Sequence, residues 1–85
     1  MAITLLYFAW VREGVGSGEE QVDPPEAVRT VADLVAWLAT RSPGHAEALA
    51  RPEKLRAAID QRFVPLATPL GDAHEVALFP PVTGG

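Results

Sequence analysis

The C-terminus is the strongest candidate for a functional site in this 85-residue sequence, because the chain ends Pro80-Pro81-Val82-Thr83-Gly84-Gly85. A C-terminal carboxylate has a reference pKa of about 3.3–3.7, so at neutral pH it is an anion that resists nucleophilic attack until it is activated, for example by adenylation. Gly84 and Gly85 have no Cβ atoms that would obstruct a narrow channel. Pro80 and Pro81 favour an extended chain, and six residues reach at most about 20 Å. We therefore predict a flexible tail, residues 80–85, that delivers Gly85 to a buried site in another protein.

A Gly-Gly ending also occurs in chains whose terminus is simply frayed. With glycine at about 7% of residues, chance produces such an ending in about one chain in 200. Because the two glycines also follow a double proline, we favour the functional interpretation of the tail.

Side chains offer little further chemistry. The sequence has no cysteine, which excludes disulfides, thiolate metal sites and cysteine nucleophiles together. His45 and His74 lie far apart without metal-ligand spacing, and Asp60 and Asp72 are expected to stabilise turns. We find no pairing of a nucleophile with a base. The sequence therefore predicts a domain with no active site, no metal and no bound cofactor of its own.

The three phenylalanines are the second functional candidate. Alternation along a strand over residues 3–11 separates two sets of side chains: Ile3, Leu5 and Tyr7 on one face, Leu6, Phe8 and Trp10 on the other. In a last strand over residues 75–79, Phe79 falls opposite Val76 and Leu78. If the aliphatic set faces a helix, Phe8 and Phe79 emerge on the open face of the sheet, where Phe63 can join them. The alternative is that the rings fill the core; we favour an exposed partner surface, because the aliphatic residues already supply a core.

The remaining pattern predicts an α+β domain over residues 1–79. Strands are expected at residues 3–11, 19–23, 55–60, 63–64 and 75–79, with a glycine-rich turn at 12–18. Val31, Leu34, Val35 and Leu38 form one apolar helical face after a capping pair, Thr30 and Asp33, and this helix should end near Arg41. A short second helix should follow Ser42-Pro43 and run to about Ala50. The order of elements predicts a mixed sheet packed on one main helix.

Composition limits the possible partners. The net charge is −4 and the seven Lys and Arg residues are scattered along the sequence, which argues against nucleic acid. The N-terminal residues have neither the basic region of a signal peptide nor the length of a membrane span. We expect a cytoplasmic protein of one domain that binds neither nucleic acid nor membranes.

The two ends of the sequence resemble one family. The segment from Glu75 reads E-V-A-L-F-P-P-V-T-G-G, which closely resembles the ending E-V-A-x-F-P-P-V-(S/T)-G-G of the small, sulfur-carrying subunits of molybdopterin synthase. The segment from Phe8 reads F-A-W-V-R-E and is similar to that family's F-A-x-V-R-E, and A-I-D-Q from Ala58 is similar to its A-V-N-Q. The sequence departs from the family at Asp60, where Asn is usual, and at Ala73-His74, where Gly-Asp is usual; these changes bear on local turns.

The resemblance implies a ubiquitin-like β-grasp fold and a role in sulfur transfer. An adenylating enzyme related to ubiquitin-activating enzymes would use ATP to activate Gly85, and a sulfurtransferase donor would convert the carboxylate to a thiocarboxylate. The tail would then enter the large synthase subunit and sulfurate cyclic pyranopterin monophosphate, so the chain would be an obligate subunit of a sulfurtransferase. Binding would involve the three phenylalanines, the tail residues Pro80 to Gly84 and Arg12, which the family keeps.

Two other interpretations share part of this prediction. A β-grasp sulfur carrier for thiamine synthesis or tRNA thiolation would share fold, tail and activation, although thiamine carriers look shorter and lack the double proline. A ubiquitin-like modifier would be joined to lysines through Gly85, whereas a plain binding module would be indifferent to the loss of Gly85.

Overall fold

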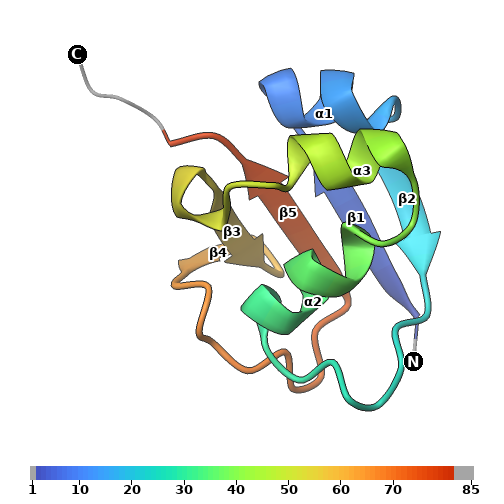
Figure 1. The fold of residues 1–85 in the computed structure, drawn as a ribbon. Coiled ribbons are helices and arrows are strands. Elements are labelled where there is room, and N and C mark those ends of the chain that lie inside the picture. Colours follow the sequence, from blue (N-terminus) through green and yellow to red (C-terminus); the bar gives the residue numbers. More distant parts are fainter. Residues whose placement is uncertain (1, 82–85) are drawn as a thin grey trace.

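The computed structural model describes residues 2–81 as one five-stranded sheet with helices packed on it (Figure 1). Along the chain its elements are β1 (Ile3–Tyr7), α1 (Ala9–Val15), β2 (Glu19–Val22), α2 (Val31–Leu38), α3 (Pro43–Ala48), the 3-10 turn η1 (Pro52–Lys54), β3 (Arg56–Ile59), β4 (Arg62–Val64) and β5 (Glu75–Phe79). The expected tail from residue 82 onward, and with it Val82, Thr83, Gly84 and Gly85, lies outside the described residues.

The sheet is mixed, and its last strand in sequence lies in the middle. The strand order is β2-β1-β5-β3-β4. β5 pairs parallel with β1, with Leu5 opposite Val76, and antiparallel with β3, with Ala57 opposite Leu78. β2 and β4 form the two edges, each antiparallel to its neighbour. This arrangement confirms the predicted α+β fold with a mixed sheet.

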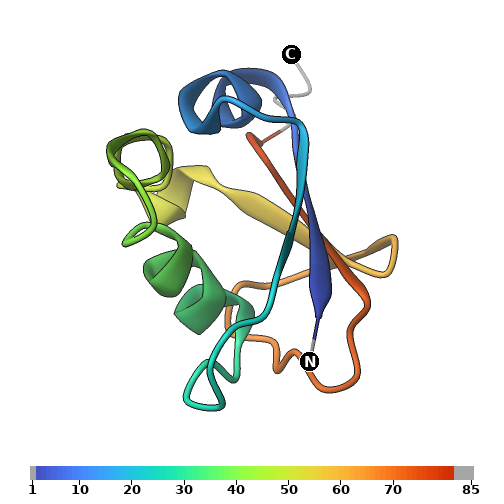
Figure 2. The same ribbon diagram turned by 90° about the vertical axis from the view of Figure 1, so that its right-hand side faces the viewer.

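One face of the sheet carries the core. Figure 2 shows α2 and α3 on the same side of the sheet, while the described residues place no element over the other side. The side chains that share this interface are buried: Ile3, Leu5, Tyr7, Val31, Leu34, Val35, Leu38, Val76 and Leu78. Leu34 and Leu38 are both fully buried, as the apolar face of the predicted helix requires.

The helix ends largely confirm their sequence signals. The Thr30 hydroxyl accepts the Asp33 N–H at 3.1 Å and the Asp33 carboxylate accepts the Thr30 N–H at 3.2 Å, which completes a capping box at the start of α2. Ser42 caps α3 by accepting the His45 N–H at 3.1 Å. α2 is shorter than expected, because the regular helix ends at Leu38 and gives way to a turn before Arg41.

The prediction of one strand over residues 3–11 was wrong. The strand stops at Tyr7, Phe8 is extended, and Ala9 has a φ of +54° that turns the chain into α1. The expected glycine turn is therefore mostly helix: Gly14 lies within α1, and Gly16, with a φ of +91°, ends it in the left-handed conformation. β2 still returns antiparallel to β1, as predicted for the second arm of a hairpin.

α1 and α3 cross at very short range, and two glycines allow this. A Cβ atom on Gly14 would lie 2.7 Å from the Ala48 Cβ, and one on Gly44 would lie 2.5 Å from the Gly14 carbonyl oxygen. Neither position has room for a side chain unless the helices move apart. The close crossing fixes α1 at the end of the sheet where β5 finishes (Figure 1).

A two-residue turn joins β3 to β4 and also holds the start of β5. Asp60 and Gln61, at φ +47° and +72°, are both left-handed, as a tight hairpin of the primed type requires. The Asp60 carboxylate accepts the N–H groups of His74 at 3.1 Å and Glu75 at 2.9 Å. The structure thus confirms Asp60 as a turn-stabilising residue.

Candidate functional site

The root of the tail is fixed by the central strand. β5 ends at Phe79, and Pro80 and Pro81, both partly exposed, continue from it. Phe8, which donates its N–H to the Leu78 carbonyl at 3.3 Å, lies beside this end of β5. The tail therefore begins at the end of the sheet at which α1 sits, whereas β1 starts at the opposite end (Figure 1).

The strand registers define which side chains share the uncovered face, which is the face of the sheet opposite α2 and α3. Leu6 pairs with Ala77, Ala77 with Ala58, and Ala58 with Phe63, and these four follow one row across the sheet. Arg56 pairs with Phe79 in the next row toward the tail. Ala57 and Leu78 are sequence neighbours of these residues in β3 and β5, and they point to the opposite face and belong to the core. The uncovered face is thus small and apolar in its centre, with aromatic rings nearest the tail.

The three phenylalanines do come together on this face. The exposed fractions are 48% for Phe8 and 83% for Phe63, whereas Phe79 is partly buried. The rings of Phe63 and Phe79 lie 5.6 Å apart at 49° and form a pair that we call the aromatic ridge. Exposure of a ring as large as Phe63 gains nothing for the fold of a monomer. The predicted exposed patch is present.

The aromatic ridge separates two hollows. One, of about 430 Å³, has Ala58 and Ala77 at its floor and Phe8 and Gln61 at its rim. The other, of about 420 Å³, is bounded by Arg56, Val64 and Pro65 beside the ridge. We call the second the Arg56 hollow. Both are shallow depressions suited to side chains of a protein partner rather than enclosed sites for a small molecule.

Two residues near the patch lie differently from expectation. Trp10, predicted to share a strand face with Phe8, lies on α1 with 41% of its surface exposed. Arg12 is on the same helix, not at a strand end, and its guanidinium packs over Gly18 so closely that a Cβ there would lie 3.1 Å from Nε. Arg12 is exposed, but it lines neither of the two hollows beside the ridge.

A partly buried hydrogen-bond chain was missed by sequence reasoning, which found no pairing of a nucleophile with a base. Glu20 Oε1 accepts from the Tyr7 hydroxyl and from His45 Nε2, each at 2.7 Å, and His45 Nδ1 lies 2.7 Å from Ser42 Oγ. The residues are far apart in sequence, so only the β1–β2 pairing and the docking of α3 bring them together. The Ser42–His45 spacing of an N-cap was the one local signal.

The electrostatics of this hydrogen-bond chain indicate a structural role. Burial, and secondarily the bond to Glu20, raises the pKa of the Tyr7 phenol, so this group stays a proton donor. Burial raises the pKa of Glu20, but the hydrogen bonds from His45 and Tyr7 outweigh it, and the net effect lowers that pKa. Because an ionised Glu20 can only accept, His45 Nε2 donates to it, while His45 Nδ1 and Ser42 Oγ share the second hydrogen bond. Because Ser42 Oγ already accepts the His45 N–H as the cap of α3, the chain fastens α3 to the sheet edge.

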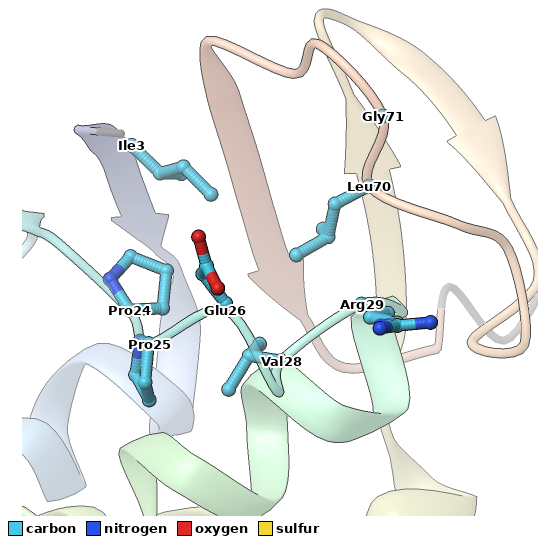
Figure 3. Close-up of a pocket in the computed structure, with 8 residues that line it drawn as sticks. All are labelled: Ile3, Pro24, Pro25, Glu26, Val28, Arg29, Leu70 and Gly71. Carbon is cyan, nitrogen blue, oxygen red and sulfur yellow. The ribbon is translucent and has the colours of Figure 1, made fainter.

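A further pocket lies at the end of the sheet remote from the tail (Figure 3). Its volume is about 440 Å³, and it is lined by Ile3, Pro24, Pro25, Glu26, Val28, Arg29, Leu70 and Gly71. Figure 3 shows the Glu26 carboxylate directed into it, while Arg29 lies at its side. This lining holds no Ser, Thr, Cys, Lys or His side chain. In residues 2–81 no helix is long and apolar enough to cross a membrane.

Comparison with known proteins places the whole chain beside sulfur carriers. The model of the ThiS family matches residues 5–85. The molybdopterin synthase sulfur carrier subunit of Escherichia coli is 46% identical over 85 residues, covering 98% of this chain and 99% of that protein. The subunit of the same name from Haemophilus influenzae is 36% identical over 83 residues, again covering 98% and 99% of the two chains.

Solved structures share the fold. A protein of Pyrococcus furiosus provisionally assigned as molybdopterin converting factor subunit 1 has a TM-score of 0.76 at 27% identity, over 96% of this chain and 99% of that one. SAMP1, a small archaeal modifier protein of Haloferax volcanii, has a TM-score of 0.71 at 26% identity over the full length of both. A chain from a complex of subunits 1 and 2 of the Helicobacter pylori molybdopterin-converting factor has a TM-score of 0.63 at 23% identity over both full lengths, a likeness of fold alone.

Proposed function

This chain belongs to the ThiS family and to the molybdopterin synthase sulfur carrier subunits within it, and on that premise we propose that Gly85 carries sulfur for the dithiolene of molybdopterin. The observation that carries the proposal is a full-length match at 46% identity to a sulfur carrier subunit, in a chain that itself ends in Gly84-Gly85. The described residues add a fixed tail root beside an exposed aromatic ridge, which suits a protein that must present its terminus to partners.

The proposed chemistry has three steps. The Gly85 carboxylate attacks the α-phosphorus of ATP, held by an adenylating enzyme, and releases pyrophosphate to give an acyl-adenylate. Sulfide sulfur, supplied by a sulfurtransferase donor, attacks the carbonyl carbon and expels AMP, which leaves a thiocarboxylate. In the large synthase subunit the thiocarboxylate sulfur attacks a carbon of cyclic pyranopterin monophosphate and displaces an oxygen substituent. Water then cleaves the acyl–sulfur bond, which leaves the sulfur on the pterin and restores the carboxylate. ATP is thus consumed by the partner, and the chain itself needs no resident cofactor.

The uncovered face supplies the docking surface in this proposal. A partner that covers the ridge would bury Phe63, now 83% exposed, together with Phe8 and Phe79. Full burial of one such ring contributes about 1.5–3 kcal/mol of transfer free energy. The residues Pro80 to Thr83 would then lead Gly84 and Gly85 into the partner, and Arg12 would lie on the neighbouring helix. Both the large subunit and the adenylating enzyme must receive the same tail, so we expect them to compete for this face.

Intact-mass measurement tests the central claim. Incubation of the chain with an adenylating enzyme of the same pathway, ATP and inorganic sulfide should raise its mass by one oxygen-to-sulfur exchange. Deletion of Gly85 should abolish the increase without changing the melting temperature. Sulfur incorporation into the truncated chain would refute the assignment of Gly85 as the carrier.

A protein modifier is the second candidate, because SAMP1 is similar in fold over its full length. A modifier forms an amide between Gly85 and a lysine of another protein. Cell extracts would then contain conjugates of higher mass that resist thiol reagents, whereas a dedicated sulfur carrier would yield only the free chain and its thiocarboxylate. A carrier for thiamine synthesis or tRNA thiolation would show the same mass change but would not restore molybdopterin synthesis with the large subunit.

A further inference from the structure

We propose that the Arg56 hollow is a recognition subsite for the protein that receives the tail: its apolar walls take up an apolar side chain, and Arg56 pairs with a carboxylate next to that side chain. This inference rests on the proposed function, with the large synthase subunit as the partner. It adds a charged contact to a docking surface that is otherwise apolar.

The position of Arg56 ties it to the tail. Arg56 is the first residue of β3 and pairs with Phe79, the last residue of β5 before Pro80. Its neighbour Ala57 is buried against the core, so strand alternation directs Arg56 to the uncovered face. A partner that covers Phe79 and accepts the tail therefore also covers Arg56.

Arg56 makes one hydrogen bond to the backbone and, among the described residues, no ion pair. Its Nη1 donates to the Leu55 carbonyl at 3.0 Å, a bond to the backbone that leaves the remaining guanidinium donors available. Over residues 2–81 the structure contains no ion pair between Arg56 and a carboxylate of its own chain. An arginine that becomes desolvated at an interface without a counter-charge opposes binding. A partner that docks on the ridge must therefore supply an acceptor, and a carboxylate matches the fork of the guanidinium best.

The sequence around the hollow reinforces the sign of this contact. The whole chain has a net charge of −4, yet residues 51–56, which lead into β3, contain three cations, Arg51, Lys54 and Arg56, and one carboxylate, Glu53. The segment that ends at Arg56 is therefore locally basic on an acidic protein. An acidic partner surface is favoured here, whereas an acidic partner would be repelled elsewhere.

Charge reversal with a matched control tests the subsite. Arg56→Glu and Arg62→Glu make the same change in net charge on the same hairpin. Arg62 pairs with Ile59, and its strand neighbour Phe63 lies on the uncovered face, so Arg62 belongs to the opposite side of the sheet. The full chain is titrated against the large synthase subunit of the same organism by calorimetry, at about 50 mM and about 300 mM salt, which span the screening range.

We expect Arg56→Glu to weaken binding at least about tenfold at low salt and less at high salt, while Arg62→Glu changes it less than about threefold. Arg56→Lys should retain most of the affinity. Equal losses in both charge-reversal variants would show a long-range charge effect and overturn the subsite, as would unchanged affinity in both. A loss in Arg56→Gln that does not respond to salt would indicate stacking on an aromatic residue and would overturn the carboxylate.

Two controls separate the possible failures. If wild-type chain does not bind the large subunit at all, the proposed function fails and not the subsite alone. If Arg56→Glu lowers the melting temperature markedly, Arg56→Gln replaces it, with a smaller loss of affinity expected in the same direction. If the subsite is present, replacing one acidic residue of the large subunit by lysine should restore the affinity for Arg56→Glu and should weaken the affinity for the wild-type chain.

Discussion

The structure predicts that stability and partner binding can be separated by two substitutions to alanine. Leu38 on α2 is fully buried in the core, whereas Phe63 on β4 is 83% exposed. Both truncations remove a large apolar side chain. Leu38→Ala should lower stability and Phe63→Ala should lower affinity, because Leu38 is buried in the free protein, whereas Phe63 is exposed there and is proposed to become buried in the complex.

The magnitudes follow from burial. Leu38→Ala leaves a cavity and should lower the free energy of unfolding by about 2–5 kcal/mol. At about 4–8 °C per kcal/mol for a domain of this size, a loss of about 3 kcal/mol lowers the melting temperature by roughly 12–24 °C. Phe63→Ala loses little burial and one ring contact with Phe79, so its cost should be about 1 kcal/mol or less. Its affinity for the large subunit should fall by at least about 1 kcal/mol, which is roughly fivefold in Kd.

The assay is a thermal melt of each variant together with calorimetric titration against the large subunit, at a temperature where both variants are folded. Leu38→Ala should then bind with nearly the affinity of wild type. The reasoning is refuted if Phe63→Ala melts the domain while leaving affinity intact, because Phe63 would then belong to the fold and the uncovered face would not be the docking surface.

Three further predictions concern the frame that holds this surface. Gly44→Ala should lower the free energy of unfolding by about 1–3 kcal/mol in urea denaturation, because its Cβ would lie 2.5 Å from the Gly14 carbonyl oxygen; a neutral result would mean that the α1–α3 crossing can open. Asp60→Ala should lower the melting temperature, since it removes the acceptor of two N–H groups at a left-handed position, whereas Asp60→Asn should be nearly neutral. The pKa values of Glu20 and Asp33 lie below their ordinary values of 4.5 and 3.8. Their contribution to the free energy of unfolding should therefore be constant above about pH 5 and be lost as acid protonates them. The double variant Glu20→Gln, Asp33→Asn should show a smaller loss of stability in acid.

The sequence predicted those parts of the fold whose signals are local and repeated. The spacing of Val31, Leu34, Val35 and Leu38 and the Thr30–Asp33 cap identified α2, and alternation placed Val76 and Leu78 in the core. These patterns are informative because one face of each element is buried, so apolar residues recur in the sequence at the period of the helix or strand. The exposed phenylalanines could be predicted for the same reason, as residues left over from a core that is already filled.

α1 was missed because its sequence contains the signals of two other structures. Leu6, Phe8 and Trp10 alternate like a strand, and Gly14, Gly16 and Gly18 suggest a turn. The helix buries only Val11 completely and depends on the close contact of Gly14 with Ala48, a tertiary contact that no local pattern reports. Likewise, the bond between Glu20 and His45 joins residues that are 25 positions apart. Long-range packing, not propensity, decided both features.

The central position of β5 limits how any partner can use the tail. β5 is held by β1 on one side and β3 on the other, and its core residues Val76 and Leu78 are fully buried. A central strand of this kind is among the last parts of a domain to open, so the start of the tail at Pro80 keeps a fixed position relative to the aromatic ridge. From Pro80 onward, six residues reach at most about 20 Å. A partner that covers the ridge must therefore place its reactive site within about that distance of Phe79, and two partners that both act on Gly85 must bind in turn.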